Sequence, residues 1–166
     1  MAYIFLTGPS GAGKTTMLGF LLSTFPTAHR IVGFTTRTPR ADEIDGVHYR
    51  FLKQAPVESL DCVDYEGNQY GFTKADVDPH ACFNMAVTDI AGTRRLLQRL
   101  PHAHAIFITT PDTDTLRKRL CQRGSPERIP LACHEFAQVR YFKHVIINDN
   151  LDSAGKELIT LIRNIL

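Results

Sequence analysis

The chain has 166 residues, of which 43% are hydrophobic and 22% charged, and its formal net charge is +2. This length and composition predict one globular domain with enough chain to bury a core. The small net charge does not support binding to a nucleic-acid polymer, and no segment approaches the ~18 consecutive apolar residues of a membrane span. The first apolar run lacks a basic leader, so we expect a cytoplasmic protein without a membrane partner.

Strands and helices are predicted to alternate along most of the chain. Apolar runs predict strands at 2–6, 31–34, 47–52, 61–65, 81–87, 104–109 and 144–148. Helical patterns predict helices at 16–25, 92–100, 112–123, 131–142 and 151–166. This alternation is typical of an α/β fold in which helices flank a parallel sheet. Residues 35–76 break the alternation, so we expect them to form an insertion at the carboxyl edge of the sheet, where ligands bind.

Residues 8–16 read Gly-Pro-Ser-Gly-Ala-Gly-Lys-Thr-Thr and match the phosphate-binding pattern G-x-x-x-x-G-K-[ST]. A predicted strand precedes them and a predicted helix follows, so the helix N-terminus adds its partial positive charge to the loop. Lys14 is expected to reach the β- and γ-phosphates, and the Thr15 hydroxyl to hold Mg²⁺. The pattern therefore predicts a site for a nucleoside triphosphate, formed by Gly8, Ser10, Gly11, Ala12, Gly13, Lys14, Thr15 and Thr16.

A second phosphate site is predicted in the insertion. Arg37 and Arg40 lie three residues apart with Pro39 between them. Their guanidinium groups suit bidentate recognition of a phosphate dianion, and the phenols of Tyr49 and Tyr70 can donate to the same group. The alternatives are arginines that are merely solvated and tyrosines that only pack.

A third basic cluster lies late in the chain. Arg119 and Arg123 are four residues apart and share one face of a predicted helix, and Arg128 follows shortly after. A solvated basic helix face is the alternative interpretation.

Taken together, these motifs resemble those of guanylate kinases. The phosphate loop is followed, in order, by T-T-R-x-P-R at 35–40, E-x-x-G-x-x-Y-x-F at 43–51 and G-N-x-Y-G at 67–71. The resemblance extends to the strand before Asp89, to R-L-x-x-R-G at 119–124 and to V-I-I-N-D at 145–149. It implies a P-loop NTPase fold with the core at about 1–34 and 77–166, a nucleoside monophosphate-binding insertion at about 35–76 and a short lid at about 119–130.

The resemblance also implies an activity, namely transfer of the γ-phosphoryl group of ATP to GMP or dGMP with Mg²⁺. It implies catalytic roles for Lys14, Arg119, Arg123 and Arg128, although Arg128 matches only if about six residues are missing before it. It implies nucleotide contacts for Asn148 and acceptor contacts for Arg37, Arg40, Tyr49, Asp61, Tyr70 and Asp89. The expected partners are these nucleotides, and the expected state is a monomer or small homo-oligomer.

Of the two carboxylates with which the family reads the base, this sequence keeps one and replaces the other. Asp61 stands where the family has a glutamate that accepts from the guanine N1–H and N2–H groups, and Asp89 stands where the family has an aspartate. Because the insertion is short before Asp61, Asp64 or Glu66 could serve in its place.

The hydroxyls that would read the guanine O6 atom are missing. Gly33 replaces a serine, and Phe72 replaces a serine or threonine, although Thr73 is adjacent and could substitute. A missing hydrogen bond costs about 0.5–1.5 kcal/mol when solvent compensates. The acceptor therefore stays open, with another (deoxy)nucleoside monophosphate or a phosphorylated ribose as alternatives to GMP.

Two other classes of protein fit the sequence less well. A guanylate kinase-like module that binds peptides without catalysis typically has a damaged phosphate loop, whereas the loop here is intact. A GTPase switch usually carries N-K-x-D, which this sequence lacks. Both features favour a kinase.

Overall fold

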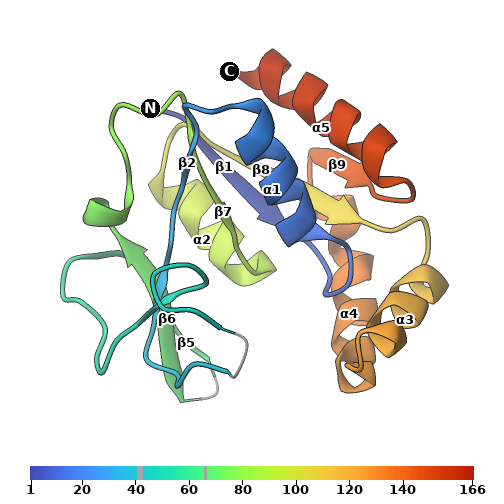
Figure 1. Cartoon of the computed structure of the whole chain (residues 1–166), viewed down its shortest axis with the longest axis horizontal. Helices are drawn as coiled ribbons and strands as arrows, with labels where there is room; N and C mark the ends of the chain where they lie inside the picture. The colour runs from blue at the N-terminus through green and yellow to red at the C-terminus, as the bar shows by residue number, and fades with distance from the viewer. Residues whose placement is uncertain (41–42, 66) are drawn as a thin grey trace.

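A computed structural model of the chain describes residues 1–40, 43–65 and 67–166. Its core is a sheet with the strand order β2-β7-β1-β8-β9 (Figure 1). The strands are β1 (Tyr3–Thr7), β2 (His29–Arg30), β7 (Asn84–Val87), β8 (Ala103–Thr109) and β9 (His144–Ile147). Every pairing between them is parallel. The predicted fold class, a parallel sheet flanked by helices, is confirmed.

Three of the helices begin at a capping side chain. The helices are α1 (Lys14–Thr24), α2 (Ile90–Arg99), α3 (Thr113–Gln122), α4 (Ile129–Phe136) and α5 (Leu151–Ile165), with short 3₁₀ segments at Lys74–Asp76, Pro126–Arg128 and Ala137–Tyr141. The side chains of Asp89, Asp112 and Asn150 each accept a backbone N–H at the first turn of α2, α3 and α5. Such caps satisfy backbone donors that a helix leaves free.

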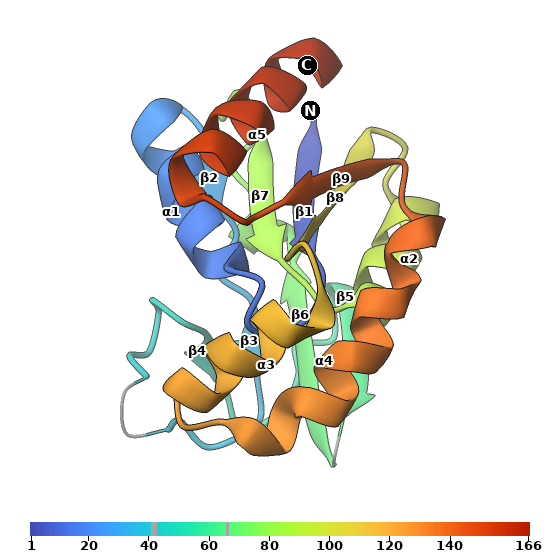
Figure 2. The ribbon, with the colours of Figure 1, turned by 90° about the vertical axis from the view of Figure 1, so that its right-hand side faces the viewer.

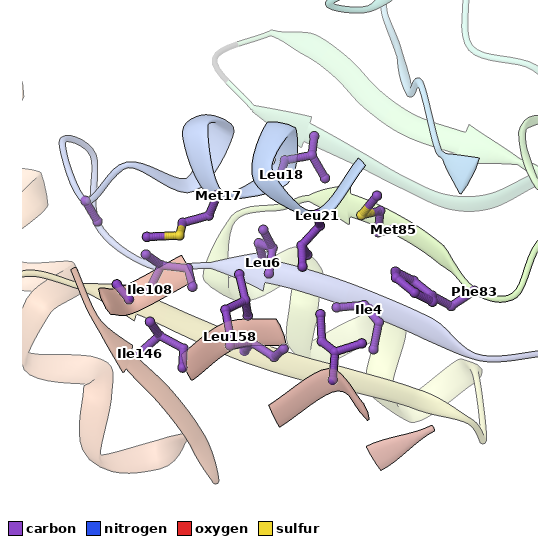
Figure 3. Close-up of a cluster of buried hydrophobic side chains, with 14 of the residues drawn as sticks. Ile4, Leu6, Met17, Leu18, Leu21, Phe83, Met85, Ile108, Ile146 and Leu158 are labelled. Atoms are coloured by element: carbon purple, nitrogen blue, oxygen red, sulfur yellow. The ribbon is translucent and has the colours of Figure 1, made fainter. Parts of the chain in front are cut away.

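Side chains on the two faces of β1 point into two separate apolar clusters. Ile4 and Leu6 pack with α1 and α5 on one face, where Figure 3 shows Met17, Leu21 and Leu158 around them. Phe5 points to the other face and packs with Phe72 and Leu96. Successive strand residues face opposite sides, so a strand buried on both faces is apolar throughout. This burial fixes β1, and with it the start of the phosphate loop.

A second, smaller sheet has the order β4-β3-β6-β5. Its strands are β3 (Phe34–Thr35), β4 (Arg50–Phe51), β5 (Ser59–Tyr65) and β6 (Asn68–Thr73), and β5 and β6 form an antiparallel pair. It lies beside α2, whereas α3 and α4 lie on the opposite side of the core sheet's carboxyl end (Figures 1 and 2). The phosphate loop after β1 therefore stands between these two units.

Several predicted elements differ from the structure. In place of the strand expected at 31–34 there are two short strands, β2 before this range and β3 at its end, because the chain leaves the core sheet after Ile31 and enters the small sheet at Phe34. No strand is predicted at 68–73, where the structure has β6 with β5 and β3 paired on its two sides. The helix expected at 131–142 begins two residues earlier as α4 and ends as a 3₁₀ segment.

Candidate nucleotide and acceptor site

The phosphate loop connects β1 directly to α1. Gly13, the residue before the helix, adopts a left-handed conformation (φ 91°), and no side chain caps the first turn. A β-carbon at this position would collide with the Asn148 side chain, so glycine is required by space as well as by conformation. The first N–H groups of α1 are therefore left for an anion.

A cavity of about 800 Å³ opens over this loop. Its lining residues are Ser10, Gly11, Gly13, Lys14, Thr15, Thr16, Arg119, Gln122, Arg123, Arg128, Asn148, Asp149 and Leu151. Ten of these are residues that the sequence assigns to the triphosphate site, whereas Gln122, Asp149 and Leu151 are not. Gly8 and Ala12, the remaining two predicted loop residues, are buried behind the loop. The structure thus brings three distant segments of the chain to one cavity.

Lys14 folds back over its own loop. Its Nζ donates to the carbonyl oxygens of Gly8 at 2.7 Å and Pro9 at 2.9 Å. The pKa of Lys14 is lowered from 10.5 to about 8, mainly by burial; the charge of Glu135 opposes this shift, and the charges of Arg128 and Arg123 add to it. A cation in this environment gains from any phosphate that enters, because the phosphate supplies the missing opposite charge.

Asn148 bonds to the phosphate loop directly, and Arg119 bonds to Asn148 in turn. The buried Asn148 side chain donates from Nδ2 to the Ala12 carbonyl at 2.8 Å. Arg119 donates from Nη2 to the carbonyl oxygens of Asn148 at 2.9 Å and Asp149 at 3.4 Å. These bonds connect the loop, the end of β9 and α3 into one framework, so both residues line the cavity and also support it.

Glu135 is a site residue that sequence reasoning missed. It projects from α4, and its Oε2 accepts the Ser10 backbone N–H at 3.3 Å. Burial raises its pKa, while the charges of Lys14 and Arg128 oppose the increase. No motif signals this residue, because a single acid on a helix is ordinary. The Glu135 carboxylate therefore lies beside the phosphate loop.

The segment between α3 and α4 is short. Arg123 caps the end of α3, Gly124 follows with φ 69°, and Arg128 ends the 3₁₀ turn just before α4. The side chains of Arg123 and Arg128 are both exposed, yet their charges act on Lys14. The two arginines therefore border the cavity without being committed to the protein framework.

In the small sheet, Arg37 and Arg40 are arranged around Glu43. The Arg37 guanidinium forms two bonds of 2.9 Å to the two Glu43 oxygens, and the Arg40 N–H donates to Oε2 at 2.8 Å. The hydrogen bonds from Arg37 lower the pKa of Glu43 to about 2. Glu43 thus fixes the Arg37 fork, and the Arg40 side chain stays exposed.

Tyr49 and Tyr70 complete this arrangement. Their rings pack edge to face with centroids 5.9 Å apart. The hydrogen bond to Glu43 raises the pKa of Arg37 most, and its hydrogen bond with Tyr70 raises it further. Burial raises the pKa of Tyr49, so this phenol stays protonated and keeps its donor at neutral pH. Arg37, Tyr49 and Tyr70 are thus neighbours, as their proposed common ligand requires.

The two carboxylates that the resemblance assigns to base recognition differ in burial. Asp61 is 5% exposed and pairs with Arg95 and Arg99 of α2. Asp89 is exposed at the start of α2, where its Oδ1 accepts the Gly92 N–H at 2.8 Å. Buried Asp61 is therefore held by the protein itself, whereas Asp89 can reach a ligand.

The possible substitutes for the missing base contacts are placed elsewhere. Phe72 is buried, with its ring beside that of Phe5. The Thr73 hydroxyl donates to Asp76 Oδ2 at 2.8 Å, so it is committed to the cap of a 3₁₀ turn. Asp64 is exposed on β5, and Glu66 lies outside the described residues.

Within the described ranges, no group of three or more His, Cys, Asp or Glu side chains is placed to hold a metal ion. No helix among the same residues has the length and apolar character needed to span a membrane.

A phosphate loop between β1 and α1, with cations from the loop and from the α3–α4 region around its cavity, defines a P-loop nucleotide-binding protein. Comparison with known proteins identifies the family: the model for guanylate kinase matches residues 1–165. The guanylate kinase of Synechocystis sp. is 34% identical over 175 aligned residues, covering 96% of this chain and 92% of the relative. That of Wolinella succinogenes is also 34% identical, covering 98% of this chain and 83% of the relative.

The fold agrees with this result. The crystal structure of guanylate kinase from Anaplasma phagocytophilum matches with a TM-score of 0.73 at 21% identity, covering 98% of this chain and 85% of that one. The chain belongs to the guanylate kinase family and is a nucleoside monophosphate kinase.

Proposed function

We propose that this protein transfers the γ-phosphoryl group of ATP to GMP or dGMP in one direct, in-line step. The observation that carries the proposal is the pairing of two phosphate-binding arrangements, one at the phosphate loop and one at Arg37, Tyr49 and Tyr70. The curated relatives named guanylate kinase support the choice of acceptor.

The donor nucleotide is bound by the loop and α1. The open N–H groups at Gly13 and the following turn donate to the phosphate oxygens, and Lys14 leaves its carbonyl partners to contact the β- and γ-phosphates. Arg123 and Arg128 approach from the lid segment and neutralise charge on the group in transfer. Because the transition state is loose, such charge neutralisation supplies much of the catalysis.

Mg²⁺ fits the same cavity. Thr15 lies in the first turn of α1 and lines the cavity with an exposed side chain, so its hydroxyl offers the oxygen ligand that this ion prefers. Bound there with the triphosphate oxygens, the ion would neutralise phosphate charge.

The acceptor phosphate is held by the exposed Arg40, the Arg37 fork and the two phenols. A nucleoside monophosphate is already anionic near neutral pH, so its oxygen attacks without a strong general base. Glu43 keeps Arg37 oriented by two bonds of 2.9 Å, which reduces the entropy lost on binding. Orientation of the attacking oxygen can contribute several kcal/mol, about 7 or more in favourable cases.

The test is an ADP-release assay with ATP, Mg²⁺ and a panel of GMP, dGMP, AMP, CMP, dTMP and ribose phosphates. We expect GMP or dGMP to give the highest kcat/KM. A preference for a pyrimidine nucleotide or a ribose phosphate would contradict the proposed acceptor.

Lys14→Ala should abolish turnover while the circular dichroism spectrum and melting temperature stay close to those of the wild type. Lys156→Ala is the matched control, because Lys156 is exposed on α5, away from the residues that line the cavity. Near-normal turnover by a folded Lys14→Ala protein would rule out the P-loop mechanism.

A further inference from the structure

Both carboxylate oxygens of Asp61 accept hydrogen bonds from arginines of α2. Its Oδ1 accepts from Arg95 Nε at 3.2 Å and from Arg99 Nη1 at 3.5 Å, and its Oδ2 accepts from Arg95 Nη2 at 3.3 Å. The Asp61 side chain is 6% exposed, whereas that of Arg95 is 31% exposed. Of this ion pair, only the guanidinium is accessible to a ligand.

The position of the pair follows from the register of the small sheet. Asp61 lies directly opposite Phe72, and Tyr70 is two residues along β6. Residues two apart on a strand share a face and are separated by about 7 Å. Tyr70 belongs to the arrangement proposed to hold the acceptor phosphate. Asp61 therefore lies on the same face of the small sheet as Tyr70, one strand repeat further along it, and Arg95 is bonded to Asp61 at this end of the face.

Arg95 also lies next to Asp89. A β-carbon built on Gly92 would be 3.1 Å from Asp89 Oδ2 and 3.4 Å from Arg95 Nη2, so both groups border the same point. The charge of Asp89 also acts on groups of both the small sheet and α4. Burial is the main cause of the raised pKa values of Tyr49 and Glu135, and the charge of Asp89 adds to both. An accessible carboxylate and an accessible guanidinium are thus side by side at the start of α2.

We propose that Arg95 is the residue that selects the acceptor base, donating to the O6 and N7 atoms of guanine while Asp61 holds its guanidinium in place. The inference rests on the proposed function. A guanidinium has five N–H donors, and Asp61 takes two of those of Arg95. A planar fork matches the adjacent O6 and N7 acceptors, and this pairing is the commonest specific contact of arginine with guanine in nucleic acids.

The surrounding residues favour this assignment. Gly33 has no side chain, and Phe72 offers only an apolar ring to the neighbouring core. Adenine presents an amino group where guanine presents O6, so Arg95 would face a donor instead of an acceptor. Asp89, beside Arg95, can accept from guanine N1–H. Asp61 is then a positioning residue instead of a base-reading one.

The test compares GMP with 2-aminopurine riboside 5′-monophosphate, which lacks O6. In the wild type, kcat/KM for GMP should exceed that for the analogue. Arg95→Met should lower kcat/KM for GMP by about ten- to a hundredfold, the range for hydrogen bonds to a charged group. It should lower kcat/KM for the analogue by a smaller factor, because the analogue keeps N7 and loses only the O6 bond, so the GMP-to-analogue ratio should fall. The KM for ATP should stay the same.

Arg99→Met is the matched control. Arg99 also contacts Asp61 and ties α2 to the Leu60 carbonyl, so it shares any structural role of Arg95. Its loss should leave the GMP-to-analogue ratio unchanged. Because Arg95→Met leaves Asp61 buried with one weak partner, the double variant Asp61→Asn/Arg95→Met removes both charges and should show the same loss of selectivity.

A GMP-to-analogue ratio that is unchanged in the Arg95 variants, or reduced equally by Arg99→Met, would overturn the inference while leaving GMP phosphorylation intact. A wild-type protein that phosphorylates no nucleoside monophosphate would refute the proposed function, and the inference with it.

Discussion

The activity of this protein should decline at a pH set by Lys14. Its pKa is lowered from 10.5 to about 8 because it is buried. A protonated lysine is needed to attract the triphosphate, so kcat/KM for ATP should be constant at neutral pH and decline above pH 8. One unit above the pKa only about a tenth of the free enzyme carries the proton, so about a tenth of the plateau value should remain at pH 9.

The assay is kcat/KM for ATP from pH 6.5 to 10 at saturating GMP, with ADP measured directly by chromatography. The profile of kcat should bend at a higher pH, because bound phosphates stabilise the charged lysine. Glu135→Gln should shift the kcat/KM limb to lower pH, because the Glu135 carboxylate raises the pKa of Lys14. Lys14→Arg keeps its charge throughout this range, so whatever activity it retains should show no limb near pH 8.

A decline of kcat/KM for ATP centred near pH 10, or a decline near pH 8 that persists in Lys14→Arg, would refute the reasoning.

The pH dependence of stability gives an independent check. The pKa of Lys14 in the folded protein is below its unfolded value, so between about pH 8 and 10.5 the unfolded chain binds more protons. In that interval Lys14 makes the free energy of unfolding rise with pH. Below about pH 8 the lysine is protonated in both states, so it adds no pH dependence to the free energy of unfolding.

Two further predictions concern the acceptor side. Arg40→Ala or Tyr70→Phe should raise the KM for GMP or lower kcat, while calorimetry finds unchanged ATP affinity in the absence of acceptor; a collapse of ATP binding would place these residues in the donor site. Gly33→Ser would put a β-carbon 2.7 Å from the Gly71 carbonyl oxygen, so it should destabilise the fold by about 1–3 kcal/mol and improve no use of GMP. A melting temperature equal to that of the wild type would contradict the packing argument.

Local patterns made the donor site predictable from sequence. A phosphate loop is a continuous segment, and the strand before it and helix after it follow from apolar spacing alone. Asn148 and the lid arginines come from distant segments, but parallel strands bring their carboxyl ends to one edge of the sheet. The motif, the cavity and the family therefore all point to the same candidate donor site.

The charged partners could not be predicted in the same way. Asp61 finds Arg95 on a helix 34 positions away, and Glu135 finds the Ser10 N–H across 125 positions. No spacing rule connects such residues, because tertiary packing alone brings them together. The two-residue strands β2 and β3 could not be predicted either. The passage of the chain from one sheet to the other leaves no signal in the apolar run at 31–34, which predicts a single strand.

The bond from Asn148 to Ala12 also bears on how the protein is made. The loop that it supports emerges early in synthesis, but its partner follows 136 positions later, directly after the edge strand β9. A nascent chain that carries the complete phosphate-loop motif therefore still lacks the contact that holds this loop in shape. We expect incomplete chains on the ribosome to leave cellular ATP unbound until β9 has docked.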